Sequence, residues 1–103
     1  MSELGTELLI TPDDAGFVLS GEIDAHTAPE LEDALSMRIE QQPALRLDMR
    51  AVTFMDSSGL RALIGATNET RSRGGDVTVQ SPTAVVRRLI EISGLSDHLS
   101  VTE

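Results

Sequence analysis

The sequence predicts an α/β fold, a single domain in which three helices pack against a mixed β-sheet with an N-terminal hairpin. Segments of alternating apolar and polar residues are separated by segments with helical periodicity, in the order β-β-α-β-α-β-α. The first two strands are joined by a short turn, whereas the later strands are joined by helices and should therefore lie parallel. The length of 103 residues is enough for one domain with its own core, expected to span residues 1–103.

The first two strands are predicted at Thr6–Thr11 and Gly16–Ile23, where apolar residues alternate with polar ones. The segment between them, Pro-Asp-Asp-Ala-Gly, consists of residues that favour turns. Together they indicate a hairpin at the start of the chain.

The first helix is predicted to begin at a capping box, in which the side chains of Thr27 and Glu30 each bond to the backbone of the other residue. Pro29 fits the first turn, where its missing N–H is not needed. Pro43 ends the helix. The residues of its apolar face are Leu31, Ala34, Leu35 and Ile39.

A third strand is predicted from the alternation over Leu45–Met49, and Val52 and Phe54 follow it on the way to a turn. The second helix begins at Asp56-Ser-Ser-Gly59 and ends before Gly74-Gly75. Its apolar stripe consists of Leu60, Leu63, Ile64 and Thr67, and Arg71 and Arg73 lie near its negative end.

The last part of the chain is predicted to hold a strand at Val77–Val79 and a third helix. That helix begins with Ser81 as N-cap and Pro82 at its first position, and it extends to Gly94. The segment Leu95–Glu103 is either a short strand or a loose tail. The apolar residues assigned to the third helix are Val85, Val86, Leu89, Ile90 and Ile92.

The net charge of −9 is concentrated in the first part of the chain. Residues 1–40 hold ten acidic residues and one arginine, whereas residues 41–103 hold seven of each. This distribution repels a phosphate backbone and contains no basic stripe, so nucleic-acid binding is not expected. The acidic part suits a basic protein surface by steering encounter, although solubility explains it equally well.

Other features of the composition argue against membrane insertion, secretion and the binding of a metal or cofactor. No apolar run approaches the roughly 18 residues of a membrane span, and Met1–Glu7 lacks the regions of a signal peptide, so a cytoplasmic protein without membrane insertion is expected. There is no cysteine, and neither His26 nor His98 has a partner at metal-ligand spacing. The chain has no lysine and no phosphate-binding loop. We expect neither a metal nor a cofactor.

A serine hydrolase is the one enzyme class whose residue types are present. Asp56-Ser-Ser-Gly59 follows a strand and opens a helix, and His26 and Asp24 are of the types that complete a triad. Nothing in the sequence brings these residues together, and a chain of 103 residues leaves little room for a pocket. We therefore expect no catalytic residue and no enzyme activity.

The Asp56-Ser-Ser-Gly59 turn contains more than a helix cap requires. Asp56 or Ser57 alone would cap the helix, and Gly59 in the first turn costs about 1 kcal/mol relative to Ala. A glycine is explained if a partner approaches the backbone closely. A phosphoryl group on a serine here would meet free amide N–H groups and the positive end of the helix dipole. The turn therefore predicts a surface site that phosphorylation switches without disturbing the fold.

Three segments of the sequence resemble the STAS-domain anti-sigma factor antagonists. The most specific is Leu47–Leu60, which contains Phe-Met-Asp-Ser-Ser-Gly-Leu and continues into Arg61–Ile64. Leu19–Leu31 is similar to that family's second strand and the entry to its first helix, and Ser93-Gly94-Leu95 is similar to the end of its third helix. The resemblance spans nearly the whole chain and implies the STAS fold.

The resemblance also implies a bacterial partner switch. In that family the antagonist binds an anti-sigma factor that is also a serine kinase, and this binding frees a sigma factor. The kinase phosphorylates a serine of the motif, the pair separates, and a serine phosphatase reverses the modification. By its position in the motif the acceptor is Ser58, although the residues alone do not separate it from Ser57. ATP and Mg²⁺ would belong to the kinase.

The expected partner-binding residues surround this serine. They are Asp24, Asp56, Ser57, Gly59 and Arg61. Four of them have simpler explanations: Asp24 could only end its strand, Asp56 could only cap the helix, Gly59 could be a tolerated irregularity, and Arg61 could be merely solvated. An alternative function also remains, because STAS domains serve as regulatory or scaffold subunits of stress-sensing and lipid-transport complexes.

Overall fold

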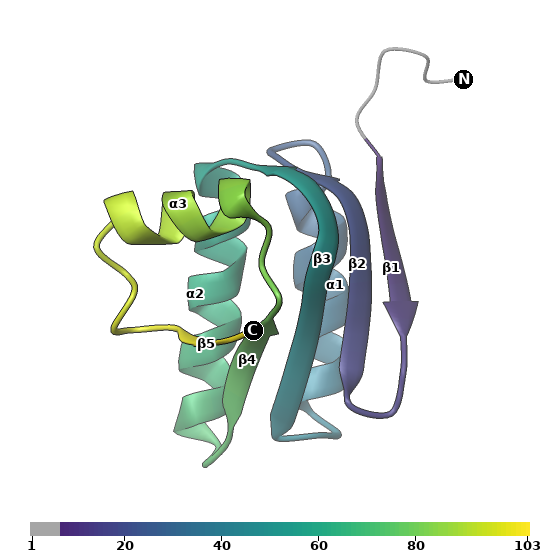
Figure 1. Cartoon of the computed structure of the whole chain (residues 1–103). Coiled ribbons are helices and arrows are strands. Elements are labelled where there is room, and N and C mark those ends of the chain that lie inside the picture. Colours follow the sequence, from purple (N-terminus) through teal and green to yellow (C-terminus); the bar gives the residue numbers. More distant parts are fainter. Residues whose placement is uncertain (1–6) are drawn as a thin grey trace.

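The computed structural model describes residues 7–103, in which five strands form one sheet and three helices pack against it (Figure 1). Thr6, the first residue of the predicted hairpin, lies outside the described residues. The strands are β1 (Leu8–Pro12), β2 (Gly16–Ile23), β3 (Ala44–Met55), β4 (Asp76–Gln80) and β5 (Ser100–Thr102). The helices are α1 (Ala28–Ile39), α2 (Ser57–Ser72) and α3 (Ala84–Ile92).

The sheet has its strands in sequence order, β1-β2-β3-β4-β5. β1 is antiparallel to β2, and the Asp13 carboxylate closes the turn between them by accepting the N–H groups of Ala15 and Gly16. All later pairs are parallel. This confirms the predicted mixed sheet and hairpin, and it places the carboxyl ends of β2 and β3 at the same end of the sheet.

One face of the sheet is covered by α1 and α2, which lie side by side behind it in Figure 1. Alternate residues of β2, β3 and β4 point into the core between the sheet and these helices, and they meet the apolar faces of both helices. The largest fully buried side chains are Leu19, Ile23, Leu31, Leu35, Leu47, Met49, Leu63, Val52, Val77, Val79, Val86 and Thr67. The predicted apolar faces of the first two helices are thus confirmed.

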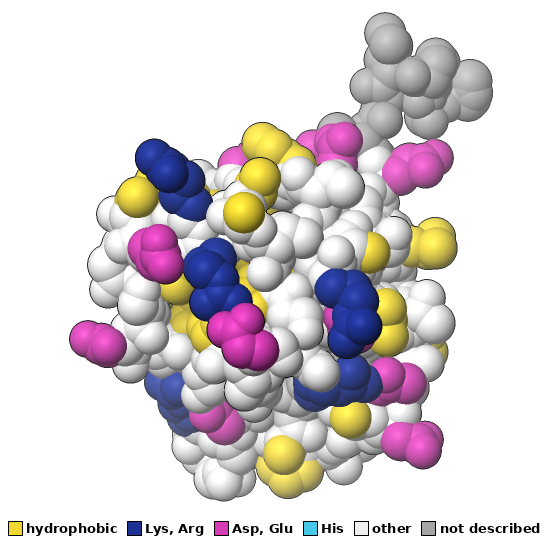
Figure 2. Space-filling model, viewed as in Figure 1, with side chains coloured by type: hydrophobic (Ala, Val, Ile, Leu, Met, Phe, Trp, Pro, Cys, Tyr) yellow, Lys and Arg dark blue, Asp and Glu magenta, His cyan; other side chains and the backbone are white. Residues whose placement is uncertain are grey.

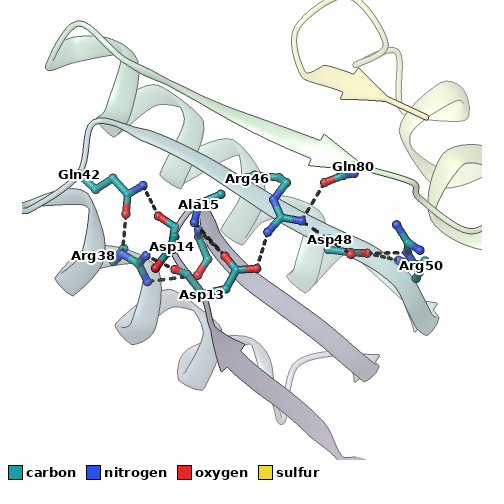
Figure 3. Close-up of polar contacts among 10 residues, drawn as sticks. Asp13, Asp14, Ala15, Arg38, Gln42, Arg46, Asp48, Arg50 and Gln80 are labelled. Atoms are coloured by element: carbon teal, nitrogen blue, oxygen red, sulfur yellow. Dashed lines mark hydrogen bonds and ion pairs between the residues drawn. The ribbon is translucent and has the colours of Figure 1, made fainter.

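The opposite face of the sheet carries a network of charged side chains centred on Arg46 (Figure 3). The Arg46 guanidinium bonds to Asp13 and donates to Gln80 Oε1 at 2.9 Å, and it lies 3.8 Å from Asp48 Oδ2. Asp48 is only 8% exposed and also accepts from Arg50 Nε at 3.3 Å. Because acids and arginines alternate here, this face has no stripe of a single charge sign (Figure 2).

The start of α1 differs from the predicted capping box. Thr27 is the N-cap residue but has helical backbone angles, φ −96° and ψ −20°, and its side chain makes no capping hydrogen bond. Its hydroxyl instead accepts the Asp24 N–H at 3.0 Å and donates to the Glu22 carbonyl at 2.8 Å. The prediction was wrong because the chain already turns at Asp24, three residues before Thr27, and the Thr27 hydroxyl closes that turn.

The start of α3 also differs from prediction, since the N-cap is Thr83 rather than Ser81. Ser81 has a positive φ of 53°, and its N–H donates to the carbonyl of Thr102, the last residue of β5. The Thr83 hydroxyl donates to the Val52 carbonyl at 2.8 Å and so ties the helix to β3. Of the five apolar residues assigned to this helix, Val85 and Ile92 are exposed.

Two strand boundaries are resolved by the structure. β3 continues to Met55 instead of descending to a turn, because it stays paired with β2 through two register shifts that change which residues face the core. The C-terminal segment forms the strand β5, the first of its two predicted alternatives. In residues 7–103, no helix is both long enough and apolar enough to cross a membrane.

Asp76 joins three elements and makes the stability depend on pH. Its carboxylate accepts from the Ser100 hydroxyl at 2.6 Å and from Arg71 Nε at 2.9 Å, and these bonds hold its pKa below the ordinary value of 3.8. A carboxyl with a lowered pKa stabilises the fold above its unfolded pKa, and that stabilisation is lost as the pH falls through the folded pKa.

We therefore expect Asp76→Asn to lower the melting temperature at pH 7. As the pH falls below 4, the variant should lose less further stability than the unmodified protein does. Thermal unfolding followed by circular dichroism at several pH values measures this. Asp97→Asn is the control, since Asp97 is exposed and makes no hydrogen bond or ion pair with the described residues. Equal pH dependence in both variants would contradict the role of Asp76.

Candidate functional site

The ends of β2 and β3 bring two predicted site residues together. Ile23 and Met55 are paired across the two strands, and the Asp56 N–H donates to the Ile23 carbonyl at 3.1 Å. Asp24 and Asp56 directly follow this pair, and adjacent strands lie about 4.8 Å apart. The turn after β2 and the turn after β3 therefore form one continuous surface.

Asp56 is the residue that caps α2. Its backbone is extended, with φ −118° and ψ −167°, and its Oδ1 accepts the Ser58 N–H at 2.8 Å. Its carbonyl accepts the Leu60 N–H at 3.1 Å. The sequence left open whether Asp56 or Ser57 was the cap, and the structure assigns Asp56.

The two serines after the cap form the first turn of α2. Ser57 is exposed and Ser58 is partly exposed. Neither hydroxyl forms a hydrogen bond with any residue in the range 7–103, so neither is bonded to a histidine of that range. Both hydroxyls are therefore accessible to a modifying enzyme, and a phosphoryl group on either would lie at the positive end of the α2 dipole.

Gly59 has a reason for being glycine that the sequence did not reveal. A Cβ at this position would lie 2.6 Å from Met55 Cγ and 2.7 Å from Ile23 Cγ2, closer than real Cβ contacts. The residue is buried, and the atoms that approach it belong to the chain's own core. The close approach that we expected from a partner is thus an internal packing contact. Leu60 and Leu63, which follow it on α2, are core residues as expected.

The turn before α1 is closed by Asp24. Its Oδ1 accepts the N–H groups of His26 at 2.9 Å and Thr27 at 3.1 Å. Thr27 is only 3% exposed, and its hydroxyl bridges the two ends of the turn as described above. Sequence reasoning missed this supporting role of Thr27. The signal was present, because an Asp followed three residues later by Thr is a pattern for side chains that bond to nearby backbone.

Arg61 lies on α2 one turn after Ser58, on the side that faces α1. Its side chain is exposed and makes no hydrogen bond or ion pair within residues 7–103. It lines a groove of about 560 Å³ between the two helices. Its charge is thus available to a ligand or partner near the serine turn.

Phe54 is a further surface residue, which the sequence analysis placed between the third strand and the turn and gave no role in the site. It lies two residues before Asp56, pairs with Glu22 of β2, and is 43% exposed. The signal was its position next to Met55, because two adjacent strand residues point to opposite faces.

In the part of the chain that the structure describes, no three His, Asp or Glu residues are grouped so that they could hold a metal ion.

Comparison with known proteins connects this site to a family. The STAS domain family model matches residues 6–103. An anti-sigma-B factor antagonist of Listeria monocytogenes is 37% identical over 84 residues, which cover 81% of this chain and 74% of that relative. The crystal structure of an anti-sigma factor antagonist from Mycobacterium paratuberculosis is 31% identical, with a TM-score of 0.74, and the match covers 95% of this chain and 86% of that one.

The fold is also that of the anti-sigma factor antagonist SpoIIAA in its unphosphorylated form, with a TM-score of 0.76 and 22% identity. That match covers 94% of this chain and 89% of SpoIIAA. Because the family model extends over all the described residues, this chain belongs to the STAS domain family.

Proposed function

We propose that this protein is an anti-sigma factor antagonist. It binds an anti-sigma factor that is also a serine kinase and thereby releases a sigma factor, and phosphorylation of Ser58 ends the binding. The observation that carries the proposal is the accessible Ser58 hydroxyl in the first turn of α2, in a chain whose curated relatives are anti-sigma-B factor antagonists.

Phosphorylation here changes charge more than structure. A phosphoryl group adds about −1.5 to −2 charges beside Asp24 and Asp56, on a protein with a net charge of −9. The helix N-terminus accommodates this charge, so the fold is retained. A partner surface that fits a neutral hydroxyl must then desolvate an unpaired charge, which costs several kcal/mol.

The remaining site residues shape or contact the interface. Asp24 and Asp56 hold the two turns, Ser57 lies on the surface beside the acceptor, and Arg61 offers a cation to the partner. Gly59 contributes by letting α2 start close to the core. The protein provides no catalysis: the kinase supplies ATP and Mg²⁺, a serine phosphatase reverses the modification, and all act in the cytoplasm.

The test is to incubate the protein with its anti-sigma kinase and ATP and to locate the phosphoryl group by mass spectrometry. We expect one phosphoryl group on Ser58, unchanged in Ser57→Ala and absent in Ser58→Ala. The two variants are matched, because neither hydroxyl is bonded within the described residues. Phosphate found only on Ser57 would disprove the assignment, and a protein that neither binds nor is modified by the kinase would disprove the proposed function.

A further inference from the structure

The groove between α1 and α2 has walls of different charge. On the α1 side, the groove is lined by Glu32, Asp33 and Glu40, and none of these three side chains forms an ion pair or hydrogen bond with residues 7–103. On the α2 side, Glu69 is neutralised by Arg73 Nε at 2.9 Å. The unpaired Arg61 on the α2 side offsets only one of the three uncompensated carboxylates on the α1 side, so the groove still favours cationic side chains.

Gly65, on the α2 wall, keeps the groove open at a cost in stability. A glycine inside a helix costs about 1 kcal/mol relative to Ala, and a Cβ at Gly65 would meet no atom within 4 Å. The fold therefore does not require this glycine, in contrast to Gly59. A bare backbone at this point is explained if another chain packs closely against it.

The groove is aligned with the acceptor serine. Ser58, Arg61 and Gly65 are spaced by three and four residues and so lie on one side of α2. At 1.5 Å per residue, Ser58 is about 10 Å along the helix from Gly65. A partner protein with a segment bound in the groove would thus be held against the first turn of α2. Arg61 would lie between the two contacts.

We propose that this groove is the docking site for a cationic segment of the anti-sigma kinase, separate from the contact at Ser58. The inference rests on the proposed function, since it names how that kinase is recognised. The unpaired carboxylates of α1 select the charge of the segment, and the space over Gly65 admits its backbone.

The experiment titrates the purified kinase with the full chain and its variants and measures both affinity and the rate of Ser58 phosphorylation. A Cβ at Gly65 meets no atom within 4 Å, so Gly65→Gln places a side chain in the groove. We expect it to weaken binding by about tenfold or more, the equivalent of about 1.4 kcal/mol, and to slow phosphorylation. Gly65→Ala is the control for helix propensity and should bind much better than Gly65→Gln. Circular dichroism confirms that both are folded.

A second comparison tests the charge. The combined change Asp33→Asn and Glu40→Gln should weaken binding by severalfold at low salt, whereas Glu91→Gln, an exposed glutamate on α3, should not. If the unmodified chain is bound and phosphorylated but Gly65→Gln is equally active, the docking site is wrong and the proposed function stands. If the unmodified chain is not bound, both fail. Dimerisation of the isolated chain that Gly65→Gln abolishes would assign the groove to a second copy instead.

Discussion

Ser58→Asp is expected to weaken binding of the anti-sigma kinase by at least about tenfold, whereas Ser58→Ala is expected to bind constitutively. The carboxylate places a charge where the partner meets a neutral hydroxyl, and a loss of roughly 1.4 kcal/mol is already a tenfold change in affinity. Ser58→Ala removes the acceptor and leaves the surface neutral. The Asp variant mimics phosphoserine incompletely, because phosphoserine is larger and carries nearly twice the charge.

Both variants should remain folded, so that a change in affinity reports on the interface and not on unfolding. Asp56 supplies the cap of α2, and the Ser58 hydroxyl is not bonded in residues 7–103, so its loss should cost less than about 1 kcal/mol. An acid is favourable in the first turn of a helix. Thermal unfolding checks this, and calorimetric titration with the kinase gives the affinities.

Ser57→Asp is the matched control for charge near the same helix end. We expect Ser57→Asp to weaken binding less than Ser58→Asp does. The charge then lies beside the acceptor position, and the partner still meets the neutral Ser58 hydroxyl. Equal affinities of the Ser58→Asp and Ser58→Ala variants would show that charge at this position does not control the interface.

Gly59→Ala should destabilise the fold by about 1–3 kcal/mol, the usual cost of overpacking a core. Its Cβ would lie 2.7 Å from Ile23 Cγ2, on a side chain that is branched and fully buried, and 2.6 Å from Met55 Cγ. The same change at Gly65 meets no atom within 4 Å and should raise the free energy of unfolding by up to about 1 kcal/mol.

Urea unfolding of the two variants measures this pair of opposite effects. The substitution and the helix are the same, so the difference isolates the contact with the core. Gly59→Ala as stable as Gly65→Ala would mean that Met55 and Ile23 shift without cost, and the packing explanation of Gly59 would then be wrong.

Elements built on a clear period were predictable from the sequence. The alternation over Leu45–Met49 and the stripe that includes Leu60 and Leu63 gave the correct strand and helix, because in both cases the apolar side chains fall on one face. Phe54 and Ile92 were less clear, since an apolar residue at the end of a period can face either way. Their exposure depends on how far the neighbouring elements extend.

The polar details of the site were less predictable. Asp56 and Ser58 could be placed from local rules, because a cap and the helix it starts are adjacent in sequence. From the sequence, the Thr27 hydroxyl could bond either to its own helix or to the preceding turn. It bonds to the turn, because Asp24 lies three residues earlier and closes that turn. The contact that requires Gly59 involves Ile23, which is distant in sequence, so no local pattern contains it.

The two carboxylate-closed turns have a consequence for how fast the switch operates. Since Asp24 and Asp56 already hold their loops by backbone hydrogen bonds, the binding surface is preorganised, and little conformational entropy is lost when a partner arrives. Modification then acts on a rigid surface by electrostatics alone. Binding and release would follow the enzymes that add and remove the phosphoryl group, with no slow refolding step of the antagonist between them.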